Sequence, residues 1–193
     1  MNFKDLLLEK KSAILKRWFD VILESYPADT SNFLKKQKNR FANPVGYTIS
    51  QGIEGLFGEI LQGIDSEKVS PFLDNIIRIK AIQDFSASQA VSFIFLLKKV
   101  IREEFEKEIK ENQFSVELAA LEVKIDELAL LSFDIFMKCR EKIYDLKAEE
   151  IKRMTFKLLQ RANLICEIQE PETDLESSQI LTQSEILTQN EKG

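Results

Sequence analysis

Apolar residues recur every three or four positions along most of the chain, which is the spacing of amphipathic helices. Residues 3–25 show it first, and Pro27 ends this helix. Asp29 and Thr30 are good N-cap residues for a short basic helix over 30–39. The first stripe consists of Phe3, Leu7, Ile14, Trp18, Val21 and Ile22.

Three further helices carry recognisable start signals. Asn43–Pro44 combines an N-cap with a proline at the first helical position, and this helix extends to about Leu61, before Gly63. Ser70–Pro71 repeats the signal for a second helix. Ser86 begins a third, whose first half is apolar on nearly all sides and is therefore expected at the centre of the fold.

A long helical pattern from Val116 to Ile165 contains neither proline nor glycine. Its apolar stripe then jumps by five residues, from Leu146 to Ile151. The jump indicates either a helix break near Lys147–Ala148, with two packed helices, or a stutter where a core helix becomes a projecting one. The stripe before the jump consists of Leu121, Ile125, Leu128, Ile135, Cys139, Ile143 and Leu146, and the one after it of Ile151, Met154, Leu158, Ala162 and Ile165.

Three segments follow from these patterns. Residues 1–147 are predicted to form a helical domain, and 148–168 a C-terminal helix extension that is a candidate for dimerisation. Residues 169–193 are polar, acidic and without an aromatic side chain, which is typical of a disordered tail. The tail repeats "ILTQ" after six residues, which is either a docking motif or solvated chain.

Composition narrows the classes of protein. The 193 residues are 44% apolar and 31% charged, as in a soluble domain, and the net charge of −5 argues against nucleic-acid binding. No apolar run reaches the roughly 20 residues that span a bilayer, and no signal peptide is recognisable, so we expect a cytoplasmic protein. Cys139 and Cys166 lack a CxxC spacing and are expected to be free thiols.

The chain contains no histidine, which excludes His-dependent triads, Cys₂His₂ zinc sites and Glu-x-x-His di-iron sites. Its carboxylates do not form a pattern that converges in a pocket, and Asp134, among apolar neighbours, is expected on an exposed face. We therefore expect no enzymatic activity, no cofactor and no metal. Arg78, Lys80 and Gln83 interrupt an apolar helix, where each reaches a buried partner, lines a pocket or extends to solvent.

Five of the six glycines fall between Gly46 and Gly63. They do not form a phosphate loop, because no strand precedes them and no Lys-Ser or Lys-Thr pair follows. On a helix they form a bare strip beside the apolar stripe. Each interior glycine costs about 0.5–1 kcal/mol relative to alanine, so close packing of another helix or a bound ligand should offset that cost. The strip consists of Gly52, Gly55, Gly58 and Gly63.

Two segments, "NRFANPVGYTISQGIEGLFGEIL" and "LDNIIRIKAIQDFSASQAVSFIFLLKKVIREE", resemble the N-terminal domain of the RsbR-type RsbT co-antagonists, in particular the RsbRD N-terminal family. The resemblance covers about residues 5–145. It implies an all-helical, stressosome-like sensory module, globin-like but without haem, that dimerises and signals through its last helix. Stand-alone members are associated with bacteria that respire sulfur compounds, sometimes beside membrane redox complexes.

The helical patterns therefore predict an all-α bundle of about six or seven helices with a long C-terminal helix, and the resemblance implies that this bundle is globin-like. We expect a homodimeric signalling domain that binds a small apolar ligand and relays to an unidentified protein partner. The alternative is a structural adaptor of a larger complex, such as a respiratory redox complex, without a ligand. The residues predicted to line the pocket are Arg40, Tyr47, Gly52, Arg78, Gln83 and Phe93.

Overall fold

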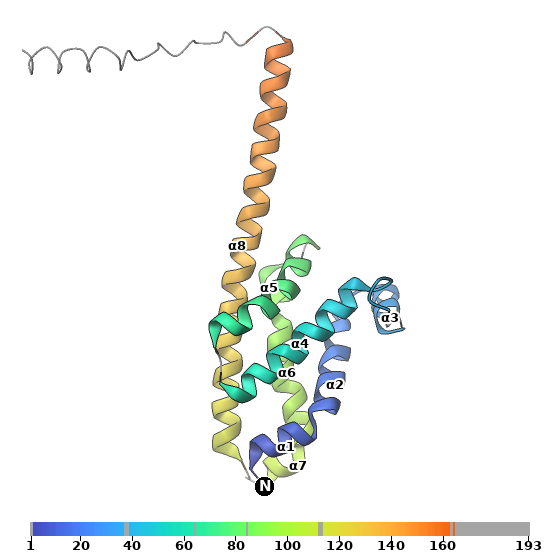
Figure 1. The fold of residues 1–193 in the computed structure, drawn as a ribbon, viewed down its shortest axis with the longest axis vertical. Helices are drawn as coiled ribbons and strands as arrows, with labels where there is room; N and C mark the ends of the chain where they lie inside the picture. Colours follow the sequence, from blue (N-terminus) through green and yellow to red (C-terminus); the bar gives the residue numbers. More distant parts are fainter. Residues whose placement is uncertain are drawn as a thin grey trace, which may run out of the picture. The chain divides into compact units, whose positions relative to one another are not determined.

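The computed structural model describes residues 2–36, 39–63, 65–83, 85–111, 114–162 and 164. Backbone contacts divide the chain into two units, residues 1–147 and 148–193, which are considered separately. The described residues form helices and no strand, so the all-α prediction is confirmed (Figure 1). The helices are α1 (Phe3–Glu9), α2 (Lys11–Leu23), α3 (Ala28–Lys36), α4 (Pro44–Gln62), α5 (Ser66–Ile82), α6 (Ala87–Glu104), α7 (Glu106–Lys110) and α8 (Ser115–Arg161).

The number of helices exceeds the prediction because two expected helices are divided. The first is interrupted at Lys10, which separates α1 from α2. A short helix, α7, follows α6 after Phe105. Both interruptions leave the apolar side chains on the core side, since Phe105 is fully buried and stacks edge-on against Phe3 with ring centroids 5.6 Å apart.

Two of the three predicted helix starts are confirmed. Asn43 caps α4, because its Oδ1 accepts a 2.8 Å hydrogen bond from the Gly46 N–H. Ser86 and Gln89 form a capping box at the start of α6. The predicted start at Ser70–Pro71 is wrong: Asp65 caps α5 six residues before Pro71, which lies inside the helix and leaves one backbone hydrogen bond unmade.

Residues 1–147 enclose one apolar core. The most extensive helix contacts are those of α4 with α5 and of α2 with α6. Trp18 of α2 is fully buried, and its Nε1–H donates a 2.7 Å hydrogen bond to the Phe93 carbonyl of α6. The indole thereby satisfies its only polar group inside the core. Two ion pairs join α6 to α8, Lys98–Asp126 at 2.7 Å and Arg102–Glu122 at 2.6 Å.

The glycine strip of α4 is covered in part by α5. A Cβ atom at Gly52 would lie 2.6 Å from Ile76 Cδ1, and one at Gly55 would lie 2.5 Å from the ring of Phe72. Both glycines therefore allow α5 to approach α4 closely. The Cβ position of Gly58 has no atom within 4 Å outside its own helix, and Gly63 ends α4 with a φ of 119°.

The long helix α8 is continuous from Ser115 to Arg161, so of the two alternatives left open by the jump of five residues, the helix break near Lys147–Ala148 does not occur. Its buried side chains all precede residue 137. Ser132, which fills a gap in the apolar stripe, is buried and donates a 2.7 Å hydrogen bond to the Leu128 carbonyl. The core-facing residues are Leu118, Leu121, Ile125, Leu128, Ala129, Ser132 and Phe136.

In the second unit the described residues are 148–162 and 164, and all of them are at least partly exposed to solvent. The predicted tail, its "ILTQ" repeat and Cys166 lie outside the described residues. Among the helices that are described, none is both long and apolar enough to cross a membrane.

Candidate functional site

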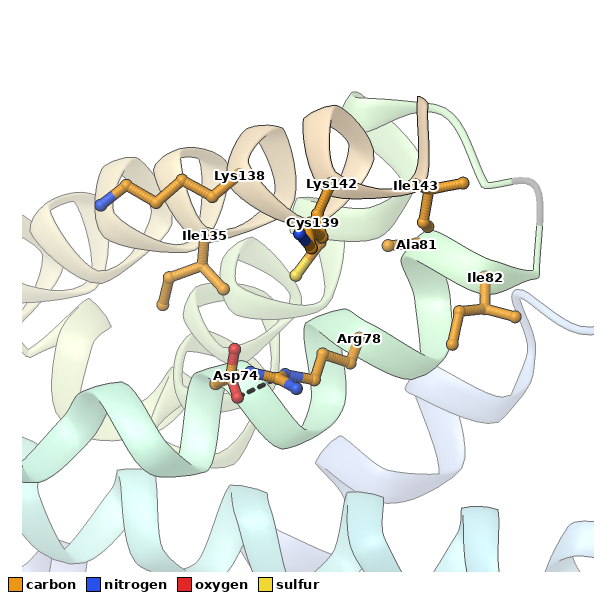
Figure 2. Close-up of a pocket in the computed structure, with 9 residues that line it drawn as sticks. All are labelled: Asp74, Arg78, Ala81, Ile82, Ile135, Lys138, Cys139, Lys142 and Ile143. Carbon is orange, nitrogen blue, oxygen red and sulfur yellow. Dashed lines mark ion pairs between the residues drawn. The ribbon is translucent and has the colours of Figure 1, made fainter. Parts of the chain in front are cut away.

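A groove with a volume of about 410 Å³ lies between α5 and the part of α8 that belongs to residues 1–147 (Figure 2). Helical geometry explains its lining, because residues spaced by three, four, seven and eight positions share one face of a helix. The α5 residues are Asp74, Arg78, Ala81 and Ile82, and the α8 residues are Ile135, Lys138, Cys139, Lys142 and Ile143.

The groove has an excess of positive charge. Arg78 and Asp74 neutralise each other through a 2.6 Å ion pair, and this hydrogen bond raises the pKa of the Arg78 guanidinium. Lys138 and Lys142 form no ion pair with any of the residues that the structure describes. Two ammonium groups thus remain in the lining beside the neutralised Asp74–Arg78 pair and the apolar side chains.

Cys139 lies in the middle of the α8 side of the groove. Figure 2 shows its thiol and Ile135 pointing from α8 toward the Asp74–Arg78 pair of α5. Burial and the Asp74 carboxylate raise the pKa of the Cys139 thiol, while the Arg78 charge lowers it. The net effect keeps the sulfur protonated near neutral pH, so Cys139 acts as a small apolar group here.

Arg140 links α8 to the C-terminal end of α5 by a hydrogen bond. Its Nη1 donates a 3.1 Å hydrogen bond to the Ala81 carbonyl, one of the last carbonyls of α5, which lack partners within the helix. Its Nη2 donates a 2.8 Å hydrogen bond to the Tyr144 hydroxyl. The end of the groove near Ala81 therefore has a fixed geometry, because one guanidinium joins both helices.

Lys80 faces away from the groove and is buried, although its position in an apolar helix was also compatible with a side chain that extends to solvent. Only 1% of the residue is exposed, and its Nζ lies 4.4 Å from the ring centroid of Phe85 and 5.2 Å from that of Tyr26. Burial lowers the pKa of Lys80 to about 8 and raises that of Tyr26 to about 12. The aromatic faces are the main electrostatic partners of this ammonium among the described residues.

Arg78 is the predicted pocket residue that lies in the groove. Arg40 and Tyr47 lie together at a separate hollow beside α4, with the guanidinium 5.3 Å from the ring. Gln83 follows α5, and its Oε1 accepts a 3.2 Å hydrogen bond from the Tyr26 hydroxyl. The other two predicted residues belong to helix packing: Phe93 is buried in the core, and Gly52 faces α5.

A second apolar surface follows the outer side of α8, opposite its core-facing residues. Its members recur at intervals of seven residues and are between 39% and 77% exposed. The sequence continues the series with Ile151 and Leu158, which are also exposed. An apolar residue at every seventh position keeps close to one face of a helix, as one of the two apolar positions of a coiled-coil heptad does. We call the part within residues 1–147 the outer stripe: Val116, Val123, Leu130, Met137 and Tyr144.

The described residues contain no group of three or more cysteine or carboxylate side chains placed to hold a metal ion. In an enzyme site a nucleophile, a base and a group that orients the base lie within hydrogen-bonding distance of one another. The described residues of the groove and of the outer stripe do not include such a set. The groove is a concave surface with a mostly aliphatic lining, and the outer stripe is a series of exposed apolar side chains.

Comparison with known proteins identifies one family. The model described as the RsbT co-antagonist protein rsbRD N-terminal domain matches residues 12–151. The match covers most of the chain and includes both segments on which the resemblance rested, so the resemblance is confirmed. Neither the curated proteins nor the solved structures that were searched contain a match.

Proposed function

Because the chain belongs to the RsbT co-antagonist protein RsbRD N-terminal domain family, a family of signalling domains, we propose that it is a ligand-responsive signalling domain of the cytoplasm. A small molecule with an apolar body binds between α5 and α8. Its binding changes the setting of α8, and a protein partner reads that change. The proposal assigns the domain no catalytic step.

The groove is the observation that supports this proposal. Its walls belong to two helices, and one of them is α8, which continues to Arg161. A ligand that prefers one spacing of α5 and α8 shifts the population of α8 settings by its difference in affinity for them. The hydrogen bond from Arg140 to the Ala81 carbonyl marks the contact that such a shift would strengthen or break.

A substitution that fills the groove should imitate the ligand. In the full-length chain we expect Cys139→Phe to change the capture of a partner from a lysate of the source organism by at least about fivefold, a typical lower bound for coupling between two sites. It should also change amide hydrogen exchange in α8. Cys139→Ser leaves the groove open and serves as the matched control, and circular dichroism verifies that both variants are helical.

The same capture experiment tests the adaptor alternative. The exposed apolar residues Ile151 and Leu158 belong to the second unit, and a full-length Ile151→Ser/Leu158→Ser variant removes them without shortening the chain. If this variant loses the partner while Cys139→Phe keeps it at the wild-type level, the protein is an adaptor and the groove does not signal.

We also propose that the domain is a homodimer that pairs along the outer stripe. A seam with one apolar residue in every heptad fits best against an identical helix in the same register, because each side chain then meets its own copy. The flanking carboxylates Glu127, Asp134 and Glu141 recur with the same interval, which limits the pairing to the stripe itself.

Charge placed in the outer stripe should separate the dimer. We expect the wild-type chain to sediment as a dimer at micromolar concentration and the Leu130→Glu/Tyr144→Glu variant to sediment as a monomer, since two carboxylates would face two others across the seam. Phe41→Glu, at a residue that is 92% exposed on another part of the fold, is the control and should remain dimeric. A wild-type monomer, or a variant that stays dimeric, would contradict the pairing.

A further inference from the structure

We propose that the groove between α5 and α8 is specific for acidic amphiphiles, of which a medium-chain fatty acid is the simplest example. Lys138 and Lys142 pair with the carboxylate, and the alkyl chain lies along the apolar side chains of both helices. This inference rests on the proposed function, because it names the ligand class of the same groove.

The lining determines the apolar part of the ligand. The apolar lining consists of Ala81 and Ile82 of α5 and Ile135 and Ile143 of α8, and the protonated thiol of Cys139 lies between the two isoleucines of α8. The volume of about 410 Å³ lies within the usual range of small-molecule sites. Ile82 is 72% exposed without a ligand, and an alkyl chain in the groove would cover part of it.

The charges determine the polar part. Of the four charged residues in the lining, Asp74 is the only carboxylate, and Arg78 already neutralises it at 2.6 Å. No lining residue therefore offers a partner to an ammonium group. Lys138 and Lys142 lie one helical turn apart on α8 and form no ion pair with any described residue, so rotation of these exposed side chains can bring both ammonium groups to one carboxylate.

Calorimetry of the full-length protein with three ten-carbon probes tests the ligand class. Decanoate, decanol and decylamine share one alkyl chain and differ in the charge of the polar group, and all three are used below the concentrations at which they form micelles. Two exposed ion pairs contribute about tenfold in affinity together, so we expect decanoate to bind about tenfold more tightly than decanol. Decylamine should bind least well, and added salt should weaken decanoate alone.

Variants locate the two parts of the site. Lys138→Gln/Lys142→Gln should weaken decanoate about tenfold and leave decanol unchanged. Lys147→Gln/Lys152→Gln removes the same charge from exposed positions of α8 outside the groove lining and should have no effect. Ile82→Glu should weaken the binding of decanoate more than Ile82→Lys does, because the new carboxylate repels the ligand. The two substitutions should affect the binding of decanol equally, because they remove the same apolar contact.

The outcomes separate this inference from the proposed function. Equal affinity for decanoate and decanol, with no effect of Lys138→Gln/Lys142→Gln, overturns the acidic class but keeps an apolar ligand in the groove. Binding of none of the three probes, or binding that Cys139→Phe and Ile82→Glu leave unchanged, overturns the acidic class and also removes the groove as the site of the proposed function.

Discussion

Replacement of Gly52 by alanine is expected to lower the free energy of unfolding by about 1–2 kcal/mol, whereas the same replacement at Gly58 should raise it by about 0.5–1 kcal/mol. Both residues lie in the interior of α4, so both gain the same helix propensity from a methyl group. They differ in what the methyl group would contact. At Gly52 it would overlap Ile76 of α5 at 2.6 Å, and at Gly58 it would contact nothing.

The cost at Gly52 cannot be relieved easily. Cδ1 and Cγ1 of Ile76 would lie 2.6 and 2.9 Å from the new methyl position, and because Ile76 is fully buried its side chain has little room to rotate away. Urea unfolding followed by circular dichroism measures both variants, with an unchanged denaturant slope as the check that only stability differs. Two shifts of the same sign would show that α5 does not occupy the glycine strip.

Replacement of Lys80 by methionine should remove a pH dependence of stability. Burial lowers the pKa of Lys80 from 10.5 to about 8, so between these values the unfolded chain binds more protons than the folded one. The free energy of unfolding of the wild type should therefore rise by about 2 kcal/mol from pH 8 to pH 10. Methionine fills the same space between Tyr26 and Phe85 without a charge, so Lys80→Met should not show that rise.

Tyr26 sets the upper end of the pH range in which the free energy of unfolding rises. Its pKa is raised to about 12, so the folded state retains the phenolic proton while the unfolded chain loses it near pH 10. Stability from this group is present below pH 10 and is lost as the pH approaches 12. Unfolding in urea at pH 7, 8, 9 and 10 measures the effect of Lys80, with Lys99→Met, at a solvent-exposed lysine, as the control. Parallel pH profiles for wild type and Lys80→Met would show that the ammonium reaches solvent.

The ends of α4 could be predicted from the sequence, whereas the helix that packs against it, α5, could not. Asn43, Pro44 and Gly63 act through local backbone geometry, so their pattern located the helix within a residue or two. The same pattern indicated a bare flank but not which helix lies against it, because Ile76 reaches that flank from another element. The start of α5 was misplaced since Asp65 and Pro71 both fit a helix start, and the earlier cap prevailed.

The phase shift in α8 has a cause that the sequence already contained. The stripe up to Leu146 lies along the core-facing side of the helix, whereas Ile151 and Leu158 continue the seven-residue series of the outer stripe. The apolar series therefore changes face while the helix remains continuous. The sequence signal of the outer stripe is thus an apolar residue at every seventh position from Val116 onward, in addition to the core stripe with its intervals of three and four.

The groove could be predicted only in part. Arg78 stood out as a charge inside an apolar helix, and the structure places it in the groove lining. Lys138 and Lys142 did not stand out, because lysines on a helix are ordinary surface residues until the fold places an apolar wall opposite them. Lys80, two positions from Arg78, has the opposite environment since a helix turns about 200° over that interval.

The buried indole of Trp18 has a practical consequence for all of these measurements. It is the only tryptophan of the chain, it is excluded from water, and its N–H is bonded to the Phe93 carbonyl. Fluorescence excited at the indole band therefore reports one contact, between α2 and α6, and its emission should shift to longer wavelength when that contact opens. The protein thus carries an intrinsic optical probe of its core that requires no label.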